Sequence, residues 1–179
     1  MENIKLVTSN ENKLKEFQRY IPSLKSEKGK DLPEVDGNKE EVAIYKAKMA
    51  GDGFLIEDTI LEVDGKEIVD IRWKLNELQN NSARWITTLA LNKGGSIYLY
   101  KGETLGTINT EKYQENSFGF DSVFIPHGSS QTLHEMGDKR EPFSARKRAI
   151  EALVENNFYF KMDIKNIQEW KGRWQNSKN

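Results

Sequence analysis

Strand-like and helix-like segments alternate along this chain, and that alternation is the strongest constraint on its fold. Ile4–Val7 is a short run of strand-forming residues, and apolar residues at helical spacing follow it from Leu14 to Ile21. A second helical pattern occupies residues 39–50 and precedes an apolar, strand-like run at Phe54–Glu57. Interleaved strands and helices predict an α/β or α+β fold built on a mixed sheet.

The second half of the chain adds a hairpin to this alternation. Periodicity alone leaves residues 83–92 open to either a helix or a strand. Their β-branched and aromatic residues, and the turn at Lys93–Gly95 that follows, favour a hairpin with residues 96–101. The remaining expectations are a helix within 68–79, strands at 103–110 and 122–125, a loop over 127–143, a helix over 144–157 and a short helix in the aromatic-rich tail 158–179.

Net charge limits the partners that this chain is expected to bind. Its 27 basic and 28 acidic residues give a formal net charge of −1, so bulk electrostatics favour neither nucleic acid nor a membrane as partner. The absence of cysteine excludes disulfides and thiolate metal sites, and it fits a reducing compartment. No apolar run has the length that a signal peptide or a membrane span needs. The predicted location is therefore the cytoplasm.

A polar turn between the first strand and the first helix is a candidate phosphate site. Amide groups at a helix N-terminus point outward with partial positive charge, so they suit phosphate oxygens. Lys13 adds a full positive charge, and Thr8 and Asn10 add neutral side-chain donors. Taken alone, the same residues are more simply explained as an ordinary helix N-cap.

Acidic residues at and after the run 54–57 are candidates for metal and water binding. Glu57 and Asp58 are adjacent at a strand end, so their side chains are expected to point to opposite faces. Adjacent acids after an apolar run favour a functional role, because burying unpaired charge is unfavourable. An ordinary strand end that turns into solvent explains the pair equally well. A carboxylate of the acid-rich loop around Asp31-Leu-Pro-Glu34 would complete a Mg²⁺ site, because Mg²⁺ takes one or two protein carboxylates plus phosphate oxygens. Taken alone, this loop is more simply explained as a charged loop in solvent.

Two later segments suit a nucleobase. Phe118 precedes a glycine that permits close approach of a planar ring, and Asp121 follows with a carboxylate for the base or ribose. Ser144 begins a helix with Arg146 in its first turn and Arg140 just before it, a combination that suits an anion or a base carbonyl. Core aromatics and an exposed basic helix face are the alternative explanations.

In their order along the chain, these motifs resemble the inosine-triphosphate pyrophosphatase family. The match consists of T-x-N-x-x-K, D-L-P-E, a helix with Lys46, E-D-T, F-G-F-D and S-x-R, and it runs from Ile4 to Leu153. Members of that family hydrolyse deaminated purine triphosphates such as ITP, dITP and XTP to the monophosphate and pyrophosphate. The resemblance implies an elongated, curved mixed sheet with flanking helices, two lobes around a central cleft, and a homodimer. It also implies a catalytic domain over 1–157, with residues 158–179 packed on that domain or on the dimer interface.

The resemblance further implies roles for individual residues. The residues implied to hold the triphosphate are Thr8, Asn10, Lys13, Lys46 and Arg72, the last of which matches a family lysine. Those implied to bind Mg²⁺ are Glu34 and Asp58, and those implied to position or deprotonate the attacking water are Asp58 and Glu57. Those implied to contact the base are Phe118, Asp121, Ser144, Arg146 and Arg140, the last of which replaces a family lysine.

Three departures from the family pattern bear on substrate choice and shape. Ala145 stands where the family has a base-contacting histidine, which weakens the expected preference for a 6-oxo purine. On that basis, Ala145→His is expected to shift preference toward ITP over ATP. The segment between Val63 and Ala83 lacks the family's Pro-Gly loop and an extra helix. Residues 158–179 continue past the point where family members usually end.

Two alternatives to a sanitising enzyme stay open at the level of sequence. One is the same chemistry with another base preference, either a pyrimidine or a standard purine triphosphate. The other is a nucleotide-binding protein that has lost turnover, although it would have little need for the water-activating Asp58. Nucleic-acid binding through the Lys- and Trp-bearing tail is a minor third alternative, and the near-zero net charge argues against it.

Overall fold

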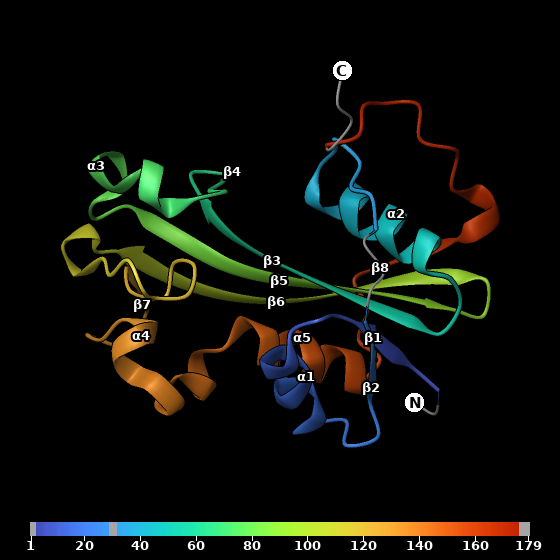
Figure 1. The fold of residues 1–179 in the computed structure, drawn as a ribbon, viewed down its shortest axis with the longest axis horizontal. Coiled ribbons are helices and arrows are strands. Elements are labelled where there is room, and N and C mark those ends of the chain that lie inside the picture. Colours follow the sequence, from blue (N-terminus) through green and yellow to red (C-terminus); the bar gives the residue numbers. More distant parts are fainter. Residues whose placement is uncertain (1–2, 29–31, 176–179) are drawn as a thin grey trace. The chain divides into compact units, whose positions relative to one another are not determined.

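A mixed β-sheet forms the centre of the fold in the computed structural model, which describes residues 3–28 and 32–175 (Figure 1). The strands are β1 (Lys5–Val7), β2 (Lys25–Glu27), β3 (Phe54–Val63), β4 (Lys66–Glu67), β5 (Ser82–Lys93), β6 (Ser96–Ile108), β7 (Phe124–Pro126) and β8 (Phe160–Asp163). Their order is β2-β1-β3-β5-β6-β7, with β4 paired to β3 and β8 paired to β6. Strand β1 pairs in parallel with β2 and β3, whereas β7 and β8 pair antiparallel with β6. The predicted mixed sheet is therefore confirmed.

Helices and helical turns flank the strands. They are α1 (Glu11–Gln18), α2 (Lys39–Ala50), α3 (Leu75–Leu78), α4 (Leu133–Met136) and α5 (Ala145–Val154), with 3₁₀ turns η1 (Ile71–Trp73), η2 (Thr110–Lys112), η3 (Gly137–Phe143) and η4 (Ile164–Asn166). In the described part of the chain, none of these helices is both long enough and apolar enough to cross a membrane.

The chain divides into two compact units. Unit 1 comprises Met1–Asp58, Thr88–Lys101 and Ala149–Asn179, and unit 2 comprises Thr59–Thr87 and Gly102–Arg148. Strands β3, β5 and β6 contribute residues to both units.

Unit 1 has two apolar clusters because its long strands point alternate side chains to opposite faces. Leu55 of β3 and Leu89 of β5 pack with Phe17 of α1 in one cluster, which also includes residues of α5. Their neighbours Ile56 and Ala90 belong to the other cluster, which α2 covers. Helices α1 and α5 therefore lie on one face of this part of the sheet and α2 lies on the other (Figure 1).

Helix α2 begins where the sequence predicts, because its first turn carries a capping box. The Asn38 side chain accepts a hydrogen bond from the Glu41 amide, and the Glu41 carboxylate accepts one from the Asn38 amide. Two backbone amides at the helix start, those of Asn38 and Glu41, thereby gain hydrogen-bond acceptors. The expectation of a helix over residues 39–50 is confirmed.

Unit 2 has a single apolar core, formed by the far part of the long strands together with β7, α4 and the start of α5. Its largest contributors include Trp85, Ile108, Phe124 and Leu133. Phe120 packs edge-on against both Trp85 and Phe124, with ring centroids 6.1 and 5.8 Å apart. The loop that carries the F-G-F-D motif is thus anchored in this core by its second phenylalanine.

Three expectations about local structure are wrong. Residues 96–101 and 103–110 were expected as separate strands, but β6 is continuous because it pairs with β8 at one end and with β7 at the other. The expected loop 127–143 contains α4, which a capping box at Thr132 and Glu135 begins. The short helix expected around residues 164–174 is reduced, in the described residues up to 175, to the 3₁₀ turn η4, because the backbone of the following residues bonds to side chains of α2 and to residues 34–36.

Candidate functional site

The strand-to-helix turn at residues 8–13 belongs to unit 1 and forms a fully bonded N-cap. Asn10 Oδ1 accepts hydrogen bonds from the amides of Asn12 and Lys13, at 3.0 and 3.2 Å. Thr8 Oγ1 accepts one from the Asn10 amide at 3.1 Å. Thr8 and Asn10 therefore shape the helix start, whereas the Lys13 side chain is directed to Glu57 within β3.

The acids and lysines singled out in the sequence meet in unit 1. Lys13 Nζ lies 2.6 Å from Glu57 Oε2, and the Glu57 side chain is only 3% exposed. Lys46 of α2 forms an ion pair with Glu34, which lies in the segment before that helix. Asp58 lies in the electrostatic field of all four of these residues. Helix α1, strand β3, helix α2 and the segment before it thus converge on one charged cluster, which is called the acid–lysine cluster below.

Burial raises the pKa of the Asp58 carboxyl group above its ordinary value. The positive charge of Lys46 lowers this pKa, but the neighbouring carboxylates Glu57 and Glu34 raise it further. When all five groups are ionised, three carboxylates face two ammonium groups and leave one net negative charge (3 − 2). Such a cluster favours an added cation or a bound proton.

The acid–lysine cluster has the right chemistry for Mg²⁺, although the described residues contain no group of three or more His, Asp or Glu side chains arranged around a common metal position. Carboxylate oxygens are the ligands that Mg²⁺ prefers. Mg²⁺ commonly takes only one or two of them and completes its shell with water and substrate phosphate oxygens. Glu34 and Asp58 fit that demand. Asp31, in the same acidic motif as Glu34, lies outside the described residues.

A second group of predicted residues meets in unit 2, around Asp121. Arg140 forms an ion pair with the Asp121 carboxylate, whose side chain is 15% exposed. Burial raises the pKa of Asp121, and the charges of Arg140, Arg146 and His134 act against that rise. His134 lies within the segment 127–143 that the sequence predicts as a loop, and its amide donates to the Asp121 carbonyl at 2.9 Å. No sequence signal marks this residue, because only the folding of α4 brings it to Asp121.

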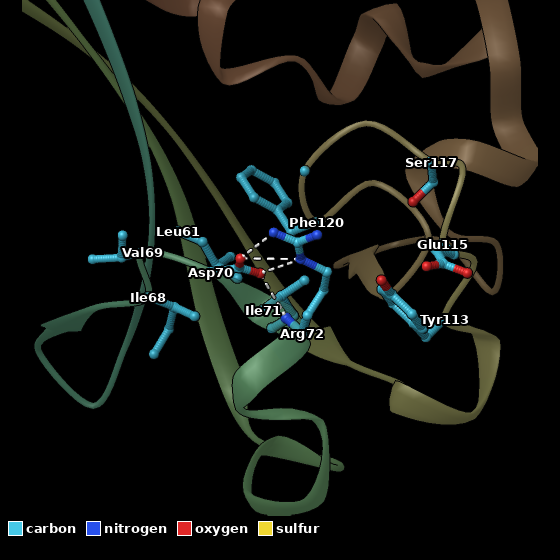
Figure 2. Close-up of a pocket in the computed structure, with 11 residues that line it drawn as sticks. Leu61, Ile68, Val69, Asp70, Ile71, Arg72, Tyr113, Glu115, Ser117 and Phe120 are labelled. Carbon is cyan, nitrogen blue, oxygen red and sulfur yellow. Dashed lines mark hydrogen bonds and ion pairs between the residues drawn. The ribbon is translucent and has the colours of Figure 1, made fainter.

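Unit 2 also contains a cavity of about 300 Å³ between η1 and the loop 113–120 (Figure 2). Arg72 lies in it, and its guanidinium donates to both oxygens of Asp70 at 2.6 to 3.0 Å. These hydrogen bonds hold the pKa of Asp70 below its ordinary value. The opposite wall includes Gly119 and Phe120 of the F-G-F-D loop. Asp70 is a further candidate site residue, because it holds the Arg72 guanidinium in the cavity. The sequence analysis did not single it out, although an acid two residues before an arginine is a pattern that indicates such a pair.

Phe118, Ser144 and Ala145 have different environments in unit 2. The Phe118 ring is 70% exposed, so it is free of the core and accessible to a planar ligand. Ser144 Oγ accepts a hydrogen bond from the Lys147 amide at 3.1 Å and caps α5. Ala145 is fully buried in the unit 2 core, together with residues such as Leu61. A larger side chain at position 145 would meet that core.

Comparisons with known proteins agree with the arrangement of both units. The model of the Ham1 family matches residues 4–67 and 65–156. The chain is 32% identical over 189 residues to an inosine triphosphate pyrophosphatase of Batrachochytrium dendrobatidis, covering 92% of this chain and 98% of that protein. It is 29% identical over 170 residues to a dITP/XTP pyrophosphatase of Korarchaeum cryptofilum, covering 83% of this chain and 92% of that protein.

A solved structure supports the same fold. The Ham1 protein of Staphylococcus aureus superposes with a TM-score of 0.71 at 21% identity, covering 86% of this chain and 98% of that one. The family match spans most of the chain, and the matched residues include those of the acid–lysine cluster and of the Asp121 group. The chain therefore belongs to the Ham1 family.

Proposed function

We propose that this protein hydrolyses nucleoside triphosphates to the nucleoside monophosphate and pyrophosphate, acting on deaminated purine nucleotides such as ITP, dITP and XTP. The observation that carries the proposal is the acid–lysine cluster, in which a buried carboxylate lies among two lysines and two further acids. Relatives across nearly the whole chain are named for inosine triphosphate and dITP/XTP pyrophosphatase activity. The role of the protein would be removal of non-standard nucleotides from the cellular pool.

The lysines of the cluster would bind the polyphosphate by exchanging partners. Lys13 and Lys46 are each paired with a carboxylate in the nucleotide-free protein. Phosphate oxygens would compete for the same ammonium groups and thereby release Glu57 and Glu34 from their ion pairs. The released Glu34 and the neighbouring Asp58 would hold a Mg²⁺ ion. When bound, that ion would supply Lewis-acid neutralisation of the charge on the leaving group.

Asp58 is the group best suited to take the proton of the attacking water. Its pKa is raised by burial, so it is a stronger base than an exposed aspartate. A water oxygen would attack the α-phosphorus while the bond from that phosphorus to the bridging oxygen breaks, and pyrophosphate leaves. Glu57, adjacent to Asp58 and released from its bond to Lys13, would orient the water. In-line positioning and charge neutralisation are the main sources of rate in phosphoryl transfer.

The unit 2 residues would recognise the nucleoside. Phe118 offers an exposed ring for stacking, and the partly exposed Asp121–Arg140 pair offers directional polar groups. Arg72, held by Asp70 in the cavity, would supply positive charge for a phosphate, as the family resemblance implies. Ser144 and Arg146 would contact the base edge.

The buried position of Ala145 supports a second candidate with the same chemistry and another base preference. A site that lacks a hydrogen-bonding group loses discrimination for the substrate atom which that group would contact.

The first experiment is pyrophosphate release across standard and deaminated ribo- and deoxyribonucleoside triphosphates, with Mg²⁺ and with an EDTA control. Release confined to ITP, dITP and XTP is the expected result. Release from another base would keep the chemistry and change the substrate. Nucleotide binding without pyrophosphate release from any triphosphate would contradict the enzymatic proposal and leave a non-catalytic binder.

Phe118→Ala is expected to raise the KM for the preferred triphosphate by about tenfold, because one base-stacking contact is worth roughly 1–3 kcal/mol. The melting temperature should stay unchanged, since the ring is 70% exposed and adds little to the core. Steady-state kinetics and thermal unfolding of the same preparation test both parts. Leu105→Ala, which removes another exposed apolar side chain of unit 2, serves as the matched control. An unchanged KM in Phe118→Ala would remove this residue from the base site.

We further propose a homodimer in the cytoplasm that uses neither nucleic acid nor a membrane as partner. The balanced charge of the chain supports the lack of nucleic-acid binding. Sedimentation velocity over a range of protein concentrations tests the dimer, and a single monomeric species at all concentrations would contradict it. A labelled oligonucleotide titrated at low salt tests the absence of nucleic-acid binding.

A further inference from the structure

The last described residues, 167–175, lie along helix α2 in unit 1 (Figure 1). After η4, Lys48 Nζ donates a hydrogen bond to the Ile167 carbonyl at 3.0 Å, and Tyr45 Oη donates to the Gln168 carbonyl at 2.8 Å. The Trp170 ring packs edge-on against Tyr45, with ring centroids 5.2 Å apart. The segment from Ile167 onward thus follows α2 from its last turn back toward its start. These residues lie beyond the part of the chain that the Ham1 family model matches, which ends at residue 156.

The same segment then pairs with the backbone around Glu34. The Gln175 amide donates to the Glu34 carbonyl at 2.9 Å, and the Asp36 amide donates to the Arg173 carbonyl at 2.9 Å. An antiparallel bridge joins Val35 to Trp174 between these two bonds. The Gln175 side-chain amide adds a hydrogen bond to the Val35 carbonyl at 3.1 Å. Three successive residues, 34 to 36, are therefore tied to the end of the chain on both sides of Val35, which is completely buried.

Trp170 holds this arrangement in place. Its indole nitrogen donates to the Arg173 carbonyl at 2.8 Å, which folds the segment back on itself. Its ring lies so close to Gly172 and Gly37 that a Cβ atom at either glycine would approach ring atoms to 2.6 and 3.1 Å. Gly37 is one residue beyond the bridged segment 34–36. A single side chain therefore contacts α2, the backbone next to Glu34 and the chain end.

We propose that residues 167–175 form a strap that positions Glu34 for metal binding, with Trp170 as its anchor and Gln175 as its terminal tie. Glu34 forms an ion pair with Lys46 of α2 and is 36% exposed at its side chain, so burial of the side chain does not by itself fix its position. The strap fixes the backbone that carries this carboxylate relative to α2, which carries Lys46. Ligand side chains held by supporting contacts bind metal more tightly, and loss of such a contact weakens metal affinity by about 10–100-fold. The contacts of the strap do not depend on the proposed function. Only the metal-binding role given to Glu34 rests on the proposed function.

Trp170→Ala in the full chain is the main test, with two readouts. In metal-free protein, hydrogen exchange of the Asp36 amide should become at least about tenfold faster, because its bond to the Arg173 carbonyl opens more often. In the pyrophosphatase assay, the Mg²⁺ concentration that gives half-maximal rate should rise by about tenfold. The kcat at saturating Mg²⁺ should stay within about twofold, since the strap does not touch Asp58.

Three further variants make the test specific. Gln175→Pro removes the amide donor to Glu34 and the side-chain donor to Val35 while leaving the Trp170–Tyr45 contact intact, and it should reproduce the effect even if Trp170→Ala fails to fold. Trp170→Phe keeps a ring on Tyr45 but loses the indole donor, so it should restore part of the protection. Lys171→Ala, at an exposed neighbour of the anchor, should behave as wild type.

The outcomes separate the strap from the enzymatic proposal. Unchanged exchange of the Asp36 amide in both Trp170→Ala and Gln175→Pro would overturn the strap. Faster exchange with an unchanged Mg²⁺ requirement would overturn its positioning role. If the wild-type protein releases no pyrophosphate from any triphosphate, Mn²⁺ binding measured by electron paramagnetic resonance replaces the assay. In that case weaker Mn²⁺ binding in Trp170→Ala would still support the positioning of Glu34, while equal binding would overturn it.

Discussion

Asp58→Asn is expected to reduce pyrophosphate release by about a thousandfold, the middle of the range seen when a general base is removed. The asparagine amide has nearly the same size as the carboxylate but cannot accept a proton at neutral pH, and it is a poor Mg²⁺ ligand. The Lys13–Glu57 and Lys46–Glu34 ion pairs do not involve Asp58 and should persist. Nucleotide binding in the variant should therefore be retained. Single-turnover kinetics with the preferred triphosphate, together with nucleotide binding by calorimetry, measure both parts.

The stability of Asp58→Asn should change in the opposite direction to its activity. The pKa of Asp58 is higher in the folded protein than its ordinary value, because burial disfavours the charged form. For such a group the folded state binds more protons than the unfolded state, so stability is highest below the unfolded pKa and falls as pH rises through the folded pKa. An asparagine at position 58 does not ionise, so the variant does not lose stability in this way as the pH rises. The metal-free variant should thus gain stability over wild type at pH 7 and lose that advantage near pH 3.

A matched control is Asp138→Asn, which makes the same chemical change at an exposed acid in η3 of unit 2. Its rate and melting temperature should equal those of the wild type. Activity of Asp58→Asn within about tenfold of wild type would contradict both the metal role and the base role, since either loss exceeds that factor. A lower melting temperature of the metal-free variant at pH 7 would show that Asp58 stabilises the fold.

Ala145→His is expected to destabilise the protein by about 3 kcal/mol. Overpacking a filled core costs roughly 1–3 kcal/mol, and burying an unpaired polar group adds a similar amount. Ala145 is fully buried among residues such as Leu61, Val123 and Leu133, so an imidazole must displace them. This expectation differs from the one drawn from the sequence, in which a histidine at this position would contact the base.

Denaturant unfolding of Ala145→His measures this loss, and an unchanged slope would show that the unfolded state is unaffected. Val154→His is the control, because it introduces the same side chain on α5 at a position that is 45% exposed. It should alter the free energy of unfolding by less than about 0.5 kcal/mol. A stable Ala145→His protein with increased preference for ITP over ATP would contradict the structural expectation and restore the one drawn from the family pattern.

Much of the fold follows from local sequence patterns. Helix α2 has the bounds predicted from its apolar spacing and its polar start, because a capping box acts within four residues. Strand β3 and the hairpin of β5 and β6 follow from β-branched and aromatic content with a glycine turn. The motif order likewise identified the family, because catalytic motifs occupy short contiguous stretches.

The chain end shows where local patterns fail. Ile164, Ile167, Trp170 and Trp174 at helical spacing predicted a short helix, yet only residues 164–166 form a 3₁₀ turn and Trp170 packs on Tyr45. The backbone of residues 34–36 and the polar side chains of α2 come close to the chain's last described residues only in the folded protein, and hydrogen bonding to them outweighs a weak helical preference. The ties between Gln175 and the backbone at Glu34 and Val35 span about 140 residues of sequence, so no local pattern contains them.

The sequence by itself determined the class of fold, the family and the identity of the charged and aromatic residues, because these depend on residue type and short-range spacing. Only the tertiary structure decided which of them are neighbours. It paired Lys13 with Glu57 across 44 positions and gave Asp121 its partner Arg140. The tertiary structure also placed Ala145 in the apolar core of unit 2. Contacts between distant segments depend on how elements pack, and packing is set by the complete chain rather than by any one motif.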